Sequence, residues 1–277
     1  MSHTLKILSL VAASTTSLTA LAQQQVWLTY DPSGNQLPET QCWALERSGG
    51  PVPTVNDNTL TLGPSSSSAY LYYSRESAIS FSRGAVIEAD VFIVDSQYSS
   101  NPCGSGQRAG FFLTMFDNTG KLMYLGIGNS TIFVTSDAGR LPGLNAPTAS
   151  VAAQGVWRTY RVEVASGVIS VFVDGALTLT APSNGPTYGT SRLASFGDQS
   201  VCSAGHSMVR NVSVLVVEDC PVDFNRDGFV DFFDYDDYVN CFEGGSCPCD
   251  QTADFNRDGF ADFFDYDQFV SDFESGC

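Results

Sequence analysis

The sequence predicts a mainly β protein, in which one large antiparallel β-sandwich is followed by a small α domain built from two loop–helix units. Hydrophobic runs of strand length, separated by turns rich in Gly, Ser, Asn and Pro, fill most of the chain. A 14-residue motif then occurs twice near the C-terminus, where half of the acidic residues gather. The 277 residues are 43% hydrophobic and 12% aromatic, which is enough to bury one large core and a second small one.

The clearest strands lie in the middle of the chain and form a predicted meander. Residues 158–164 alternate apolar and polar side chains, residues 165–167 turn the chain, and residues 168–173 alternate again. Asp174-Gly175 is a hairpin turn sequence and precedes residues 176–180. Further strands are predicted at residues 60–62, 86–94, 110–116, 122–127, 131–135 and 209–217. A single sandwich accommodates all of them.

The repeated motif occupies residues 223–236 and 254–267, and the two copies are identical at 13 of 14 positions. Each copy places side-chain oxygens at positions 1, 3, 5, 9 and 12 of a twelve-residue loop, and Gly228 or Gly259 makes the sharp turn at position 6. Position 7 contributes its backbone carbonyl. We therefore expect two calcium ions, one in each loop. The expected ligands are Asp223, Asn225, Asp227, Phe229, Asp231 and Asp234 in the first loop, and Asp254, Asn256, Asp258, Phe260, Asp262 and Asp265 in the second.

Two departures from an ordinary EF-hand define the variant. Position 12 is Asp in both loops rather than the long Glu, and residues 220–222 and 248–251 are too short and proline-containing to form a helix before either loop. An apolar stripe at helical spacing does follow each loop. The stripes are Tyr235, Tyr238, Val239 and Phe242, and then Tyr266, Phe269, Val270 and Phe273. Each unit is thus predicted to be a loop followed by a helix.

This duplicated half-EF-hand, with Asp at position 12, resembles the dockerin modules of bacterial cellulosomal proteins. The resemblance covers about residues 220–277 and is nearest to the cysteine-rich variant that ends in Gly-Cys, here Gly276-Cys277. It implies two calcium-bound loop–helix units related by a pseudo-two-fold axis, and a cohesin-like or other receptor protein as the partner. The implied partner-binding residues, at loop positions 10 and 11, are Phe232, Phe233, Phe263 and Phe264.

Paired phenylalanines differ from the small or polar residues that cellulosomal dockerins usually place at these positions. Exposed rings would form a binding patch for a receptor other than a cellulosomal cohesin, whereas buried rings would belong to the core of the module. A thrombospondin-type string of calcium loops is the alternative to a dockerin, but such a string lacks the aromatic helix after each loop.

The large region resembles the concanavalin A-like and laminin G-like jelly rolls over roughly residues 40–217. The resemblance rests on the strand and turn pattern of residues 110–126 and 157–175. It implies a carbohydrate-recognition domain with a polysaccharide as its ligand. Candidate sugar-binding rings are Trp27, Trp43, Tyr98 and Tyr188.

Two alternatives to a lectin stay open: a glycoside hydrolase, and an adhesive or structural sandwich with no sugar ligand. Retaining hydrolases place two carboxylates close together across the scissile bond. Glu88 and Asp90 would supply the first two acids of the motif that this fold uses, but Phe92 or Ile93 stands where the third is expected. No catalytic residue is therefore assigned.

Residues 1–22 are typical of a secretory signal, with a short apolar run and Ala20-Leu21-Ala22 before the expected cleavage site. We expect a secreted protein, extracellular or associated with a cell surface, with a sandwich at residues 23–218 and a dockerin-like domain at residues 219–277. In that setting the cysteines are expected to form disulfides. The candidates are Cys42, Cys103, Cys202, Cys220, Cys241, Cys247, Cys249 and Cys277. Because three precede Glu218 and five follow it, complete pairing needs at least one bridge between the two regions.

The charge of the chain excludes several partners. The formal net charge is −17, and from Cys220 onward fifteen Asp and Glu stand against two Arg. Such a surface repels nucleic acid and anionic membranes, and no apolar run after the signal is long enough to insert into a bilayer. The sequence thus predicts a lectin-like protein that a calcium-dependent module attaches to a cell-surface or extracellular assembly.

Overall fold

The computed structural model describes residues 25–66, 68–76, 85–97, 108–116, 122–135, 146–183, 193–200, 202–217, 220–227, 229–249 and 251–276. The expected signal at residues 1–22 lies outside these ranges, and so do Tyr98, Cys103, Tyr188 and Cys277. In the described part of the chain, no helix has the length and apolar character needed to cross a membrane.

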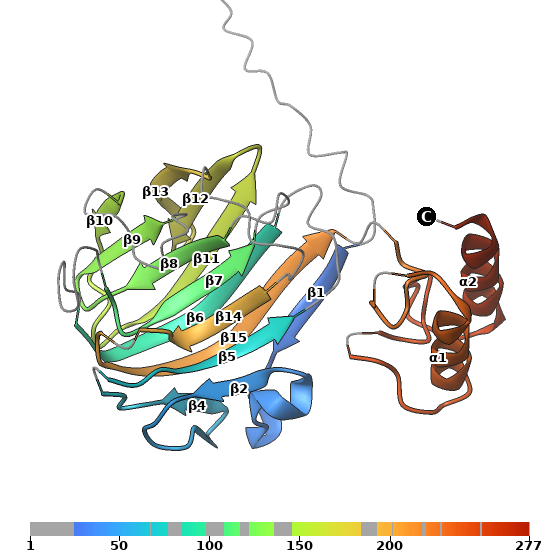
Figure 1. Ribbon diagram of the computed structural model, residues 1–277, viewed down its shortest axis with the longest axis horizontal. Helices are drawn as coiled ribbons and strands as arrows, with labels where there is room; N and C mark the ends of the chain where they lie inside the picture. The colour runs from blue at the N-terminus through green and yellow to red at the C-terminus, as the bar shows by residue number, and fades with distance from the viewer. Residues whose placement is uncertain are drawn as a thin grey trace, which may run out of the picture.

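Two antiparallel sheets pack face to face as a sandwich (Figure 1). The first sheet has the order β13-β12-β11-β6-β15-β4-β3, with β1 paired to β15. Its strands are β1 Gln25–Tyr30, β3 Thr54–Asn56, β4 Thr59–Leu62, β6 Ala85–Ser96, β11 Trp157–Ala165, β12 Val168–Val173, β13 Ala176–Pro182 and β15 Gly205–Val217. The second sheet has the order β10-β9-β8-β7-β14-β5-β2. Its strands are β2 Ala44–Arg47, β5 Leu71–Glu76, β7 Phe112–Phe116, β8 Leu122–Ile127, β9 Thr131–Thr135, β10 Thr148–Ser150 and β14 Leu193–Asp198.

The predicted meander is confirmed as β11, β12 and β13. Its two hairpin turns each place two successive residues at positive φ, Ser166 and Gly167 in the first and Asp174 and Gly175 in the second. That conformation matches the twist of the flanking strands, which is why Asp-Gly turns connect them. All of the other predicted strands are present as well, so the mainly β sandwich is confirmed.

The core of the sandwich lies between the sheets. Alternation along β11 buries Tyr160, Val162 and Val164 and leaves the residues between them on the outer face. At one end of the core, the Phe196 ring packs against Tyr30, Trp43 and Tyr73, with ring centroids 5.9, 5.0 and 5.6 Å away. Apolar burial of this kind is the main source of stability in a domain of this size.

The C-terminal module consists of two helices, α1 Phe232–Phe242 and α2 Phe263–Ser275, each preceded by its loop. The predicted loop-then-helix order is therefore confirmed for both copies. Figure 1 shows the helices side by side at the outer edge of the molecule. Tyr238 and Phe269, which hold equivalent places in the two copies, stack with ring centroids 3.9 Å apart. This contact thus joins equivalent residues of the two copies.

A disulfide joins the two regions of the chain. Cys42, which directly follows the short helix η2 (Pro38–Gln41), is bonded to Cys249 of the C-terminal module, with Cα atoms 6.2 Å apart. The predicted bridge between the two regions is thus confirmed. A second disulfide, Cys241–Cys247, lies within the module, and Cys202 and Cys220 are also disulfide-bonded.

Candidate functional site

The two repeated loops have the same internal hydrogen bonds, and each is organised by its last residue. The buried carboxylate of Asp234 accepts the backbone N–H of Asn225 (3.0 Å) through Oδ1 and that of Asp231 (2.8 Å) through Oδ2. Asp265 makes the same pair of bonds, each 2.8 Å long, in the second loop. The position-12 carboxylate therefore draws positions 3 and 9 of its own loop together.

Position 9 connects each loop to its helix. Asp231 is the N-cap of α1 and accepts the backbone N–H of Phe233 at 2.8 Å, while Asp234 bonds back to the backbone of Asp231 in a reciprocal capping box. Asp262 caps α2 in the same way. A capping box satisfies two backbone donors at a helix start. The residues that begin each helix are therefore also those expected to hold the ion.

The side chains at positions 1, 3 and 5 accept backbone N–H groups within the loops. In the first loop, Asn225 Oδ1 accepts the N–H of Asp227 and Asp227 Oδ1 accepts the N–H of Phe229, both at 2.9 Å. In the second loop, Asp254 at position 1 accepts the N–H groups of Asp258 (3.1 Å) and Gly259 (3.0 Å). The side-chain oxygens of alternate residues thus gather along one short loop, as calcium ligation requires.

Among the described residues, no group of three or more His, Cys, Asp or Glu side chains converges as a metal site. The loop carboxylates and amides bond to backbone N–H groups instead. The donor set is nevertheless all oxygen, with carboxylates, one side-chain amide and one backbone carbonyl in each loop. Hard oxygen donors of this kind fit calcium and not zinc, which prefers nitrogen and sulfur.

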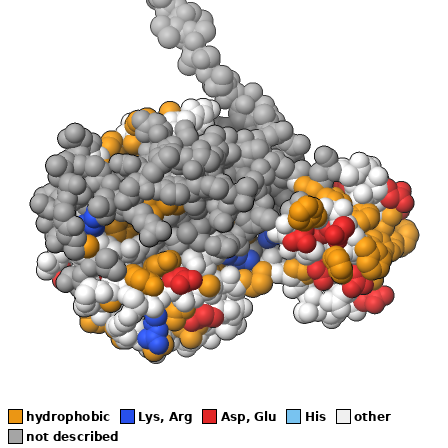
Figure 2. Space-filling view, viewed as in Figure 1, with side chains coloured by type: hydrophobic (Ala, Val, Ile, Leu, Met, Phe, Trp, Pro, Cys, Tyr) orange, Lys and Arg blue, Asp and Glu red, His pale blue; other side chains and the backbone are white. Residues whose placement is uncertain are grey.

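The four phenylalanines at loop positions 10 and 11 are exposed. Phe232, Phe233, Phe263 and Phe264 leave 66 to 71% of their surface open to solvent, so of the two alternatives that the sequence left open, burial in the core of the module is excluded. The N-terminal turn of each helix points these rings away from the helix–helix contact that buries Tyr238 and Phe269. Figure 2 shows hydrophobic side chains on the surface of this module with acidic side chains around them.

Two further phenylalanines join this surface. Phe229 and Phe260, which sequence analysis singled out only for their backbone carbonyls, expose 71% and 73% of their surface. Position 7 is expected to contribute only its backbone carbonyl, so its side chain is not needed for ion binding. A phenylalanine at this position in both loops is therefore a sequence signal that could have indicated an exposed aromatic side chain.

The exposed rings continue into a central pair of tyrosines. Phe232 stacks on Tyr235 and Phe263 stacks on Tyr266, each with ring centroids 6.2 Å apart, and the two tyrosine hydroxyls are 2.6 Å apart. The hydrogen bond to Tyr266 raises the pKa of the Tyr235 hydroxyl. These four rings form one aromatic ridge that runs across both repeats.

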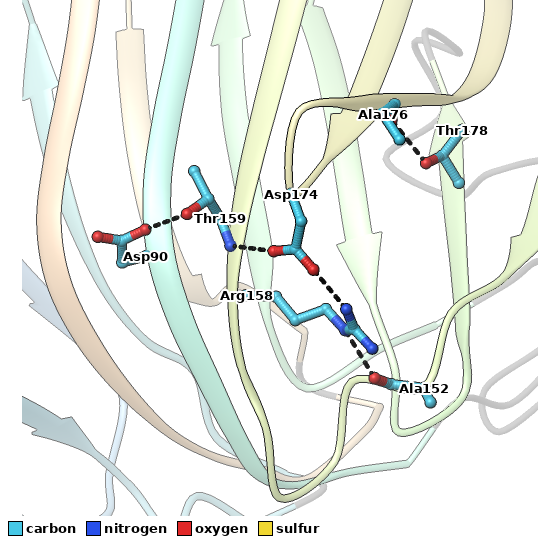
Figure 3. Close-up of polar contacts among 7 residues, drawn as sticks. All are labelled: Asp90, Ala152, Arg158, Thr159, Asp174, Ala176 and Thr178. Atoms are coloured by element: carbon cyan, nitrogen blue, oxygen red, sulfur yellow. Dashed lines mark hydrogen bonds and ion pairs between the residues drawn. The ribbon is translucent and has the colours of Figure 1, made fainter.

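The outer face of the first sheet carries a second group of polar and aromatic side chains. Asp90 on β6 accepts the hydroxyl of Thr159 on β11 at 2.5 Å, and the Thr159 N–H donates to Asp174 at 3.0 Å (Figure 3). Trp157 lies near Phe92, with centroids 5.6 Å apart, and the Arg210 guanidinium lies 4.2 Å from its ring centre. An aromatic ring, a carboxylate and a guanidinium therefore stand next to one another on an open face.

The structure places the acids of the hydrolase alternative on this same face. Glu88 forms an ion pair with Arg161 at 3.4 Å, and Arg161 also pairs with Glu163 at 2.8 Å. Glu88 and Asp90 lie on β6, a central strand between β11 and β15. Both acids are thus already engaged by neighbouring strands.

Of the four candidate sugar-binding rings, the structure describes the side chain of Trp43. Trp43 is buried in the sandwich core, where its Nε1–H donates to the Thr29 carbonyl at 3.0 Å, so its prediction as a sugar-binding ring is wrong. Tyr98, Tyr188 and the side chain of Trp27 lie outside the described residues.

A buried acid that sequence analysis missed lies at the end of β14. Asp198 accepts the hydroxyl of Ser65 and the backbone N–H of Ser200, the latter at 3.0 Å. Burial raises the pKa of Asp198 to about 8, although both hydrogen bonds lower it. Its burial could not be read from the surrounding sequence, because its side-chain partner Ser65 lies 133 residues away along the chain.

No family model matches the chain, and no curated protein matches it. Among solved structures, the chain is similar to a carbohydrate esterase of the Shiga toxin-encoding bacteriophage phi24B, at 12% identity over 68% of this chain and 97% of that one, with a TM-score of 0.48. It is also similar to a galectin-like protein of unknown function from Bacillus subtilis, at 11% identity over 68% and 96% of the two chains, with a TM-score of 0.43. The Emp47p carbohydrate recognition domain matches at 11% identity over 63% and 88%, also with a TM-score of 0.43. The function is therefore argued from the residues of this chain.

Proposed function

We propose that residues 220–276 form a calcium-dependent docking module that binds a receptor protein and so attaches the secreted sandwich to a larger assembly. The observation that carries this proposal is the duplication itself. Each copy combines a loop of oxygen ligands with a pair of exposed phenylalanines at the start of the following helix.

Calcium would have a direct electrostatic role in this module. Each loop brings four aspartates within twelve residues, for example Asp223, Asp227, Asp231 and Asp234 in the first. Like charges at this spacing repel, and a bound divalent ion offsets the repulsion while it orders the loop. When bound, the ion would be held by the side chains and carbonyls at the six predicted positions of each loop.

The exposed rings would supply the docking energy. Soluble monomers rarely expose large contiguous apolar patches, and aromatic anchors dominate the energetics of protein interfaces. The acidic side chains around Phe232, Phe233, Phe263 and Phe264 favour a receptor whose apolar pocket is surrounded by Lys and Arg.

Calcium titration of the full chain by calorimetry tests the first half of this proposal. We expect two equivalents to bind, and we expect one to be lost in each of the variants Asp234→Ala and Asp265→Ala. Asp236→Ala, an exposed carboxylate on α1 outside the ligand positions, is the matched control and should leave both sites intact. Absence of binding by the unmodified chain would disprove the calcium site.

Capture of a receptor from the secreted proteins of the source organism tests the second half. The immobilised full chain should retain a protein in calcium and release it in chelator. Retention should fail in a Phe232→Ser/Phe263→Ser variant that still binds two calcium ions. A receptor that is retained equally by this variant would place the docking surface elsewhere.

A carbohydrate-recognition function is the second candidate, and it concerns the sandwich. The observation in its favour is the open face where Trp157 and Phe92 stand beside Asp90 and Arg210, because sugar rings stack on aromatics while their hydroxyls bond to charged groups.

Retention of the full chain on a panel of insoluble polysaccharides tests this candidate, with Trp157→Ala as the variant expected to lose retention. The full chain is needed because removal of the module would leave Cys42 without Cys249. Release of soluble sugar that is abolished in Glu88→Gln would instead establish the glycoside hydrolase alternative. Absence of both retention and release would leave the sandwich as an adhesive or structural domain.

A further inference from the structure

The segment between α1 and the second loop, residues 243–253, has no helix or strand among its described residues and is held covalently at two points. Cys247 is bonded to Cys241 at the end of α1, and Cys249 is bonded to Cys42 in the sandwich. Only Pro248 separates the two bridged cysteines in the sequence. The Cys42–Cys249 bridge thus links the sandwich directly to the segment that leads into the second loop.

The same segment also touches the first loop. The Arg226 guanidinium, from position 4 of that loop, donates to the carbonyl of Cys249 at 3.2 Å. Gln251 Nε2 donates to the carbonyl of Phe224 at position 2, at 3.1 Å. Cys249 therefore lies at a point where the sandwich, the first loop and the approach to Asp254 of the second loop meet.

We propose that the Cys42–Cys249 disulfide positions both calcium loops, so that calcium binding and the integrity of this bridge are thermodynamically linked. This inference rests on the proposed calcium site and goes beyond it, since it assigns a role to residues outside the ligand set. With the bridge intact, the segment that leads into Asp254 is restrained before an ion arrives. With the bridge open, calcium binding has to order that segment as well, which lowers the affinity.

Linkage makes the effect reciprocal. If an intact bridge raises calcium affinity, bound calcium raises the stability of the bridge by the same factor. A dithiol opens the bridge by thiol–disulfide exchange: the two thiols of the reductant become a disulfide, and Cys42 and Cys249 each become a thiol. Two electrons and two protons pass from the reductant to the protein. Calcium should therefore protect this disulfide from a dithiol.

The module is expected to stay folded without the bridge. Its core consists of Val222, Phe224, Tyr238, Phe255 and Phe269, with Cys241 beside them, and none of these residues depends on Cys42. The hydroxyl of Tyr238 also donates a hydrogen bond to the carbonyl of Ala253 at 3.4 Å, a contact that does not involve the disulfide. A change in calcium affinity can therefore be separated from loss of the fold.

The first experiment compares the full chain with a Cys42→Ser/Cys249→Ser variant by calcium calorimetry, with the helical circular dichroism of both measured in saturating calcium. We expect the variant to keep its helices and to bind calcium about fivefold more weakly or worse, the lower end of typical coupling. Equal affinities in the two proteins would overturn the inference and leave the proposed calcium site standing. Failure of the unmodified chain to bind calcium would overturn both.

The second experiment needs no calcium-affinity measurement. The full chain is treated with a dithiol in calcium or in chelator, newly formed thiols are alkylated, and Cys42 and Cys249 are followed by mass spectrometry. At redox equilibrium with the dithiol and its oxidised form, we expect the ratio of disulfide to free thiols at Cys42 and Cys249 to be about fivefold higher or more in calcium. An equilibrium ratio that does not depend on calcium would contradict the linkage.

The repeat offers a matched pair of variants for the noncovalent part. Arg226→Ala removes the contact with Cys249, whereas Arg257→Ala changes the equivalent position of the second loop. Arg226→Ala should weaken calcium binding more than Arg257→Ala does, and it should lower the equilibrium ratio of disulfide to free thiols at Cys42 and Cys249 in calcium. Equal effects of the two substitutions on both readouts would show that Arg226 acts only as a loop residue.

Discussion

In the sandwich, two sheets of seven and eight strands enclose a continuous core of aliphatic and aromatic side chains, whereas the C-terminal module buries a small aromatic cluster between two short helices. The module also carries fifteen acidic residues, and its described cysteines are disulfide-bonded. Small domains rarely fold on core burial alone and often need disulfides or a metal ion. The difference indicates that core burial stabilises the sandwich, while we expect the module to depend on its internal Cys241–Cys247 bridge and on calcium ions.

Removal of calcium should separate the two regions most strongly. In chelator we expect the backbone amides of α1 and α2 to lose hydrogen-exchange protection almost completely, because folding of such metal modules is coupled to ion binding. Amides of β6, β11 and β15 should exchange as slowly as before. Hydrogen exchange with mass spectrometry measures both regions in one sample. Equal protection of α1 and α2 with and without calcium would show that the bridges alone hold the module.

Within the module, buried and exposed phenylalanines should differ sharply in their contribution to stability. Phe269→Ala removes a fully buried ring that stacks on Tyr238 and should cost about 3–5 kcal/mol of module stability. Phe264→Ala removes an exposed ring from the same helix and should change stability by less than about 0.5 kcal/mol. Loss of helical circular dichroism in urea measures both in saturating calcium. A large cost at Phe264 would mean that its ring is part of the core.

In the sandwich, the buried acid Asp198 predicts a dependence on pH. Its pKa is raised to about 8, whereas the unfolded chain releases the proton near pH 4. Between these values the folded state holds a proton that the unfolded state has lost, so stability falls as pH rises, by at most about 1.4 kcal/mol per pH unit.

Asp198→Asn should therefore flatten this decline between pH 5 and pH 8. Because all three tryptophans, Trp27, Trp43 and Trp157, belong to the sandwich, their fluorescence during urea unfolding reports this region alone. Asp57→Asn, in an exposed turn, is the control and should keep the decline. An unchanged slope in Asp198→Asn would assign the pH dependence to other groups.

Side-chain contacts on the outer face of the sandwich should contribute least to stability. Arg210→Gln removes the guanidinium from the Trp157 ring and should lower stability by about 0.5–1 kcal/mol. The same fluorescence measurement detects the change, and Arg47→Gln on the exposed strand β2 should have a smaller effect. A cost of several kcal/mol at Arg210 would mean that this face is part of the structural core and not an open surface.

The secondary structure of the module was predicted more completely than that of the sandwich, because its loops combine a fixed residue spacing with a glycine at a fixed turn position. Strands β1, β2, β3, β5, β10 and β14 were not predicted. In β14, Ala194, Ser195 and Phe196 are all buried, so no alternation marks the strand, and Gly197 interrupts it at φ +126°. In β2, most side chains are exposed, so the hydrophobic signal is weak. In both strands, tertiary contacts and not a local alternation decide which side chains are buried and which are exposed.

The candidate site divides in the same way. The expected calcium-ligand positions follow from residue spacing alone. The exposure of Phe232 and Phe263 depends instead on how α1 and α2 pack, which no local sequence pattern records. The partner of Cys42 was equally out of reach, because it lies 207 residues away along the chain.

The stacked pair of rings also marks a position where the two copies have diverged. Tyr238 in the first copy corresponds to Phe269 in the second, and the hydroxyl that distinguishes them bonds to the carbonyl of Ala253 in the connecting segment. Phe269 has no hydroxyl with which to make such a bond. The first copy therefore attaches itself to the connecting segment through a hydrogen bond that its own duplicate cannot make.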